Sequence, residues 1–342
     1  MSCTPRSTYH AFRESYKTLQ HLHFPGISTF QHGLNVQNLL MQYNLDYKHI
    51  ESGFRRLGKL QLEPKHSSPI AIESDSNLSF EKWQSKLEQL QNLQPQPSIL
   101  TFQFQHTYAG GIKSKKTMTD AQIAAFQSIR EEGTSTLLDL LMLILSLLLS
   151  QTRASLPPPR FYQLDRGGQV TYHGPGQLVA YLVLDIKAFD HLTAKCYVNN
   201  VLLKLIQNVL MNEFGIVSYL LDENPGIWVY SKGWDSLQSG PDEVGERLSH
   251  NWRKIASVGV KVRRGVTEYG IALNVDPSLI YLNTFEMCGL KDRRATSIKE
   301  ILSERDERIG DKNNLSVDKV ADLYAKQVAN ALNMNHINKT IL

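Results

Sequence analysis

The sequence predicts a mixed α/β fold of the α+β type, built around one mixed sheet. Apolar strand-like runs and amphipathic helices are both present, but they do not alternate as regular strand–helix–strand units. The chain has 342 residues, 42% hydrophobic and 20% charged, which is enough for a full core and typical of a globular protein. No internal repeat is visible.

The first part of the chain is predicted to hold few elements. Residues 21–47 begin as a strand or turn and continue as a helix, because apolar residues recur there at helical spacing. Residues 51–96 are rich in Ser, Gln, Lys, Glu and Pro, which predicts a mobile insertion with one short helix near 80–93. The other predicted elements are a strand at 98–105, a turn at 106–112 and a helix at 119–131.

A leucine-rich run at residues 137–149 is the most hydrophobic segment. A membrane-spanning helix needs about 20 apolar residues. This run is shorter and contains Asp139. We therefore favour a packed or interfacial helix over a membrane anchor.

The second part of the chain is predicted to form most of the sheet. Residues 178–186 are apolar except for Asp185, as in a strand buried on both faces. Residues 191–214 and 316–332 carry apolar side chains along one helical face. The remaining predicted strands are 160–165, 216–220, 226–230, 254–262 and 269–275, with a turn at 263–267.

Residues 166–177 read Arg-Gly-Gly-Gln-Val-Thr-Tyr-His-Gly-Pro-Gly-Gln. Four glycines and a proline exclude a helix interior and let the backbone approach a ligand closely. The stretch lacks the Gly-x-Gly-x-x-Gly and Gly-Lys-Ser/Thr patterns of dinucleotide and phosphate loops. Its polar side chains include His173, which could act as acid or base or only hold the loop in place. This loop is the first candidate site.

Two residues outside the loop have side chains suited to acyl transfer. Cys288 precedes a glycine in a predicted irregular segment, and a thiolate forms thioesters that keep an acyl group activated. Lys254 opens a predicted core strand, where an ammonium group is unusual. An ammonium beside a thiol lowers the thiol pKa, and desolvation lowers the pKa of the lysine itself. Cys3 and Cys196 are predicted to be inert free thiols.

The stretch at 166–177 resembles the signature of the lipoyl(octanoyl) transferase family, almost letter for letter. The resemblance covers roughly two-thirds of the chain. It implies the fold shared by biotin and lipoate protein ligases, in a catalytic domain at 21–310. A leader at 1–20 would precede this domain and a helix within 311–342 would pack on it. Insertions are expected at about 51–96, 134–157 and 231–250.

The resemblance also implies roles for individual residues. Cys288 matches the acyl-carrying cysteine of a Cys-Gly pair, and Lys254 matches the lysine that lowers the cysteine pKa and transfers protons. Tyr269 departs from the family, which commonly has His before this glycine, and a tyrosine carries no proton near pH 7. The implied substrate-binding residues are Arg166, Gly167, Gly168, Gln169, Val170, Thr171, Tyr172, His173, Ser257, Val258, Gly259, Gly270, Ile271 and Ala272.

The implied reaction transfers an octanoyl group from octanoyl-acyl carrier protein, through a cysteine thioester, to a lysine of lipoyl domains. These domains belong to 2-oxo-acid dehydrogenases and to the H protein of the glycine cleavage system. No cofactor and no metal are expected, because the donor is already an activated thioester. A net charge of +4 without a long basic run indicates no nucleic-acid partner, and no membrane partner is expected. The resemblance places the protein in the mitochondrion, with weak support from the transit-like composition of residues 1–24.

Three alternatives remain. An ATP-dependent lipoate or biotin protein ligase would need an adenylate site and no cysteine, so Cys288 argues against it. A non-catalytic lipoyl-domain binder, its pocket altered by insertions and Tyr269, conflicts with the intact signature, Lys254 and Cys288. A thiol hydrolase would require a water-accessible site and usually a Cys–His pair.

Overall fold

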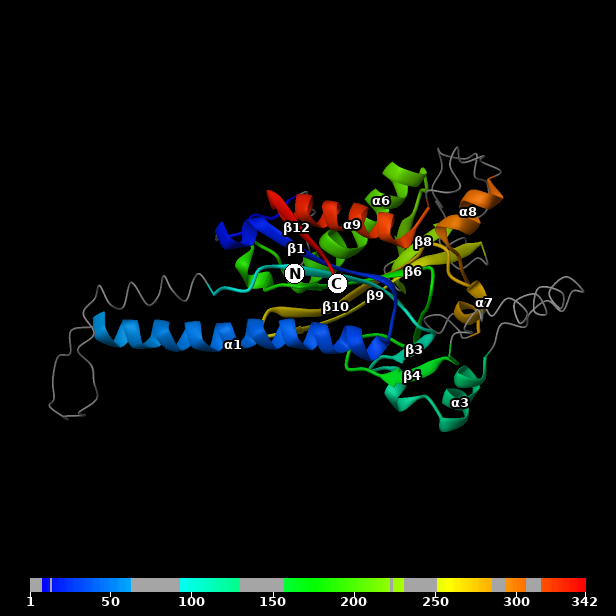
Figure 1. Ribbon diagram of the computed structural model, residues 1–342, viewed down its shortest axis with the longest axis horizontal. Helices are drawn as coiled ribbons and strands as arrows, with labels where there is room; N and C mark the ends of the chain where they lie inside the picture. The colour runs from blue at the N-terminus through cyan, green and yellow to red at the C-terminus, as the bar shows by residue number, and fades with distance from the viewer. Residues whose placement is uncertain are drawn as a thin grey trace, which may run out of the picture.

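The computed structural model describes residues 8–12, 14–62, 93–129, 157–221, 224–230, 251–284, 293–305 and 315–342. A central sheet lies between two helical layers (Figure 1). Helices α6 (Lys204–Phe214) and α9 (Val317–Ala331) cover one face, and the long helix α1 (Phe30–Leu62) runs along the other. This layered arrangement confirms the predicted mixed α/β class.

The central sheet contains nine of the described strands, in the order β12-β1-β2-β6-β10-β9-β8-β7, with β11 beside β9. Strand β1 is parallel to β12 and β2, β11 is parallel to β9, and the other pairs are antiparallel. The strands are β1 (Thr18–Ser28), β2 (Ser98–Phe104), β6 (Gln177–Val183), β7 (Tyr219–Leu221), β8 (Asn224–Tyr230), β9 (Trp252–Arg263), β10 (Val266–Asn274), β11 (Arg294–Ala295) and β12 (His336–Ile341).

A second, small sheet joins β3 (Thr107–Gly110) to β4 (Arg160–Gln163) and β5 (Thr171–His173). The prediction of a turn at 106–112 is therefore wrong for its centre. Strand β3 pairs in parallel with β4 and antiparallel with β5, which lie more than fifty positions later in the chain. Pairing with strands so distant in the sequence cannot be predicted from a short stretch of residues.

Helix α1 is longer than the sequence predicts. It continues to Leu62, so the prediction of a mobile insertion is wrong for residues 51–62. Local pairs such as Arg55 with Glu51, 2.9 Å apart, support this polar section. The rest of that insertion up to residue 92, the leucine run at 137–149 and the segment at 231–250 lie outside the described residues.

Several predicted elements are confirmed. Strand β6 is buried along its whole length, and the β9–β10 hairpin turns at Arg264 and Gly265, which both have positive φ as in tight hairpin turns. Helix α3 (Asp120–Ser128) is capped by Thr119 and α9 by Ser316. The predicted helix at 191–214 consists of α5 (Ala194–Cys196), the π-helical η4 (Tyr197–Leu203) and α6. The remaining elements are η1 (Glu14–Lys17), η2 (Ser114–Lys116), η3 (Ile186–Ala188), α7 (Leu279–Leu282) and α8 (Ile298–Glu304).

The alternation along β6 separates two cores. Leu178, Ala180 and Leu182 pack with residues of α6 and α9, whereas Val179 and Tyr181 face the aromatic layer beneath α1. No helix within the described ranges is long and apolar enough to cross a membrane.

Helix α1 approaches the sheet closely at Gly33. A Cβ at this position would lie 2.5 Å from Cζ of the buried Phe104, whereas a Cβ at Gly53 on the same helix would meet nothing within 4 Å. We expect Gly33→Ala to lower the free energy of unfolding by about 1–3 kcal/mol through overpacking. Gly53→Ala should raise it by about 0.5–1 kcal/mol, because alanine loses less entropy in a helix. Urea unfolding measures both, and equal effects would contradict this packing.

Candidate active site

Arg166 holds the glycine-rich loop from inside. Its side chain is 6% exposed, and its guanidinium donates to the carbonyl oxygens of Gly167 (3.0 Å), Gln169 (3.1 Å) and Ala109 (2.8 Å). A Cβ at Gly259 of β9 would lie 2.7 Å from Arg166 Cδ, so glycine is needed where the arginine crosses the strand. The loop is thereby fixed to both β3 and β9.

His173 is buried at the end of β5. Its Nδ1 lies 2.8 Å from Gln177 Oε1, and its ring stacks on Phe30 with 5.5 Å between centroids. Burial lowers the pKa of His173 to about 4, the Gln177 hydrogen bond raises it less, and Arg166 lowers it further. The imidazole is neutral at neutral pH, which favours holding the loop over acid–base chemistry.

A series of amide groups connects this loop to the strand of Lys254. Gln177 Nε2 donates to Asn274 Oδ1 (2.9 Å), and Asn274 Nδ2 donates to the carbonyl of Thr296 (2.9 Å). The backbone N–H of Thr296 in turn donates to the carbonyl of Lys254 (2.9 Å). Because both ends of each side-chain amide are engaged, the amide orientations are fixed and Nδ1 of His173 carries the proton.

Lys254 is buried near the start of β9, where its ammonium has defined neighbours. The side chain is 4% exposed, and Nζ donates to the carbonyl of Pro225 at 2.9 Å. The same nitrogen lies 5.3 Å from the ring centroid of Trp228, within the range of a cation–π contact. A buried ammonium with such contacts is held in one place.

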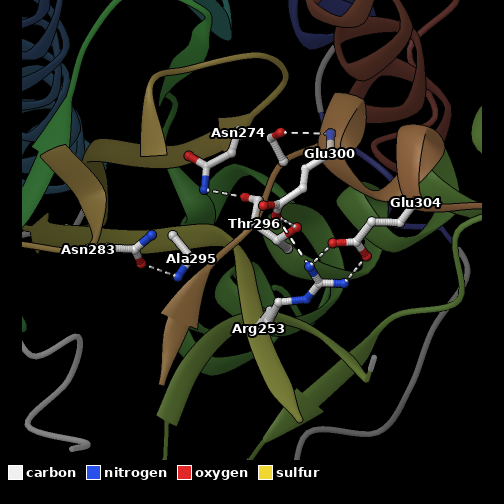
Figure 2. A network of polar contacts seen from close by, with 8 residues as sticks. Arg253, Asn274, Asn283, Ala295, Thr296, Glu300 and Glu304 are labelled. Atoms are coloured by element: carbon white, nitrogen blue, oxygen red, sulfur yellow. Dashed lines mark hydrogen bonds and ion pairs between the residues drawn. The ribbon is translucent and has the colours of Figure 1, made fainter. Parts of the chain in front are cut away.

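Cys288 lies outside the described residues, but the chain on either side of it is described. Ala295 of β11 pairs with Lys254, and its N–H donates to Asn283 Oδ1 at 2.8 Å (Figure 2). The guanidinium of Arg293 lies 5.1 Å from the same Trp228 ring that Lys254 approaches. The chain on both sides of Cys288 is thus anchored beside Lys254.

Helix α8 is joined to the start of β9 by ion pairs. Figure 2 shows Arg253, the residue before Lys254, facing Glu304 and Glu300. Its guanidinium donates to both carboxylate oxygens of Glu304 (2.6 and 2.5 Å), and these bonds raise the pKa of Arg253. Thr296 Oγ1 donates to Glu300 Oε2 at 2.5 Å, so β11, β9 and α8 are joined in one network.

Two adjoining chambers lie between the loop and the sheet. The outer chamber has a volume of about 330 Å³ and contains Lys254, and the inner one is far tighter, about 30 Å³, and mainly apolar. Their linings share Arg166, Thr171, Ser257, Val258 and Gly259. Of the other predicted substrate-binding residues, Gly167, Gly168, Gln169 and Val170 line the outer chamber, and His173, Gly270, Ile271 and Ala272 line the inner one.

Among the predicted substrate-binding residues, Tyr172 lines neither chamber. It is fully buried, stacks on Tyr281 with 5.2 Å between centroids, and its hydroxyl lies 2.6 Å from His106 Nδ1. Sequence reasoning also missed lining residues, because nothing in a single apolar run shows which face meets a cavity. These are Phe30, Leu164, Val179 and Tyr181 in the inner chamber and Lys113, Val198, Asn224, Pro225 and Val260 in the outer one.

Cys196 is buried and disulfide-bonded. The prediction of a free thiol is therefore wrong for Cys196. Within the described ranges, no group of three or more His, Cys, Asp or Glu side chains could hold a metal ion.

The chain matches a protein family and full-length relatives. The model of the lipoyl protein ligase A/B catalytic domain matches residues 159–329. Mitochondrial octanoyltransferase of Kluyveromyces lactis is 33% identical over 339 residues, covering 99% of this chain and 88% of the relative. The Saccharomyces cerevisiae mitochondrial octanoyltransferase is 34% identical over 337 residues, covering 96% and 86%. The chain belongs to the octanoyltransferase family.

Membership in the octanoyltransferase family makes the protein an acyltransferase of protein lipoylation and confirms the ligase-like fold and the mitochondrial location. A solved structure of LipL1 from P. falciparum in complex with lipoate is more distantly similar. It is 11% identical, with a TM-score of 0.44, covering 94% of this chain and 66% of that one.

The depressed pKa of His173 predicts a pH-dependent stability. The unfolded histidine titrates at 6.5 and the folded one at about 4, so the unfolded state binds a proton first as pH falls. Burying neutral His173 therefore carries no protonation cost above pH 6.5. As the pH falls from 6.5 towards 4, this cost lowers the free energy of unfolding by about 3 kcal/mol. We expect His173→Gln to flatten this dependence in urea unfolding at pH 7.5, 6 and 5. A slope as steep as that of the wild type would contradict the assignment.

Proposed function

We propose that this octanoyltransferase moves an octanoyl group from octanoyl-acyl carrier protein to a lysine of a lipoyl domain, through a thioester on Cys288. One observation carries the proposal. Lys254 and the glycine-rich loop line an outer chamber of mixed polarity that adjoins a more apolar inner one, and the described residues on both sides of Cys288 are anchored beside Lys254. This gradient suits a reacting carbonyl at one end and a hydrocarbon chain at the other.

In the first half-reaction the Cys288 thiolate attacks the carbonyl carbon of the donor thioester. The bond to the carrier sulfur then breaks, and the carrier leaves as a thiol while the octanoyl group stays on Cys288. The Lys254 ammonium favours the thiolate and is a proton source for the departing sulfur. Backbone N–H groups of the 171–176 and 257–259 regions are the candidate oxyanion donors. Two positions are excluded from them: Pro175 has no N–H, and the N–H of Gly176 donates to Gln103 Oε1 at 3.0 Å.

In the second half-reaction the lysine amine of the lipoyl domain attacks acyl-Cys288. An amide forms, the Cys288 thiolate leaves, and the proton lost by the amine goes to Lys254, which gave one up in the first half. The contact of Nζ with the Pro225 carbonyl keeps the group at the outer chamber through both steps. The exposed cations of η2 and the net charge of +4 suit acidic carrier and lipoyl domains.

The thioester predicts a covalent intermediate. After incubation with octanoyl-carrier protein, intact-protein mass should show one hydroxylamine-labile octanoyl adduct on the wild type and none on Cys288→Ser. An apo lipoyl domain should discharge it. Because Cys196 is disulfide-bonded and the chain has three cysteines, all proteins are reduced before incubation. Reduced Cys3→Ser is the matched control and should retain the adduct. Acylation of the domain only with ATP and free octanoate would instead indicate a ligase, and the absence of any transfer would leave a binding protein.

Lys254 is predicted to serve both half-reactions. Lys254→Gln should slow adduct formation by about 100-fold and move its pH dependence towards that of an ordinary thiol, because the nearby cation is lost. Lys254→Arg retains a cation that does not deprotonate, so it should impair discharge to the lipoyl domain more than adduct formation. Quenched-flow experiments with mass spectrometry measure adduct formation and discharge separately. Rates within about twofold of wild type for both variants would reject this role.

A further inference from the structure

Tyr269 has an unusual backbone conformation in the middle of a core strand. Its φ is +63°, although both neighbouring stretches of β10 pair regularly with β9. Positive φ is uncommon for residues other than glycine and is an outlier for a bulky aromatic side chain. Such conformations persist where the surroundings over-determine them, and they concentrate at functional sites.

The surroundings of Tyr269 show what maintains this conformation. Its backbone N–H donates to Oε1 of Gln37 at 2.6 Å, and Gln37 is fully buried on α1. The ring lines the inner chamber and meets the Tyr181 ring edge-on, with centroids 6.0 Å apart. With 9% exposure, Tyr269 is part of the aromatic layer between α1 and the sheet.

Because of its position in the inner chamber, the Tyr269 ring limits the space for an acyl chain. An acyl carbonyl held near Lys254 would direct its hydrocarbon chain past Ser257 and Gly259, which line both chambers. In the inner chamber the chain would meet Phe30, Tyr181 and Tyr269, where the open volume is about 30 Å³ instead of about 330 Å³. Each further methylene must then displace a packed ring, which is unfavourable in a dense core.

We propose that Tyr269 sets the length of the acyl chain that this enzyme accepts, by closing the inner chamber against saturated chains longer than the octanoyl group. The proposal rests on the proposed octanoyl transfer and goes beyond it. It assigns selection against longer chains to one side chain and to the Gln37 contact that holds its backbone N–H.

The test compares acyl-carrier donors from hexanoyl to tetradecanoyl with the full-length protein. Tyr269→Gly removes the ring while glycine accepts the positive φ without strain, so the backbone is preserved. We expect the ratio of kcat/KM for dodecanoyl over octanoyl to rise about tenfold or more, since a few methylenes in an apolar pocket carry that discrimination. Tyr269→Phe keeps the ring volume and should leave this ratio within about twofold of that of the wild type.

Tyr269→Trp increases the side-chain volume at this position, whereas Tyr269→Gly removes it. It provides an independent test if the glycine variant folds poorly. Its larger ring should move the preference from octanoyl towards hexanoyl. Transfer of octanoyl by the wild type with an unchanged chain-length profile in both Gly and Trp variants would overturn the proposal and leave the proposed function intact. Failure of the wild type to transfer any acyl chain would overturn both.

Discussion

The guanidinium of Arg166 connects the parts of the molecule that form the site. It engages carbonyl oxygens of the glycine-rich loop and of β3, and it crosses β9 where Gly259 leaves room. Five donors on one planar group can satisfy several backbone carbonyls that would otherwise be buried without partners. The small sheet, the loop and the central sheet are therefore held in a fixed relative position. This position determines the shape of the outer chamber.

A second set of contacts connects the loop to the strand that carries Lys254. The amides of Gln177 and Asn274 run from His173 to Thr296, whose N–H meets the Lys254 carbonyl. Arg253 and α8 hold the adjacent backbone from the opposite side. The proposed transfer between two protein substrates would need such fixed geometry, because positioning supplies much of the rate when a bimolecular step becomes effectively unimolecular.

The sequence predicts best what depends on local pattern. The apolar run of β6 and the amphipathic face of α9 follow from residue spacing, and the signature loop stands out by its glycines. Strand β3 is missed because its partners are distant in sequence, and residues 51–62 because a polar helix lacks an apolar stripe. Likewise, the position of Tyr172 outside both chambers depends on a β-strand register that a single strand does not reveal.

The proposed acyl path runs from Lys254 past Ser257 and Gly259 to the aromatic end of the inner chamber. A direct measurement uses an octanoyl donor with a diazirine at the terminal carbon, irradiated on the enzyme and mapped by peptide mass spectrometry. We expect crosslinks to the peptides that contain Phe30, Tyr181 and Tyr269. Crosslinks confined to the exposed turn η2 or to α3 would show that the chain ends outside the inner chamber, and would contradict it.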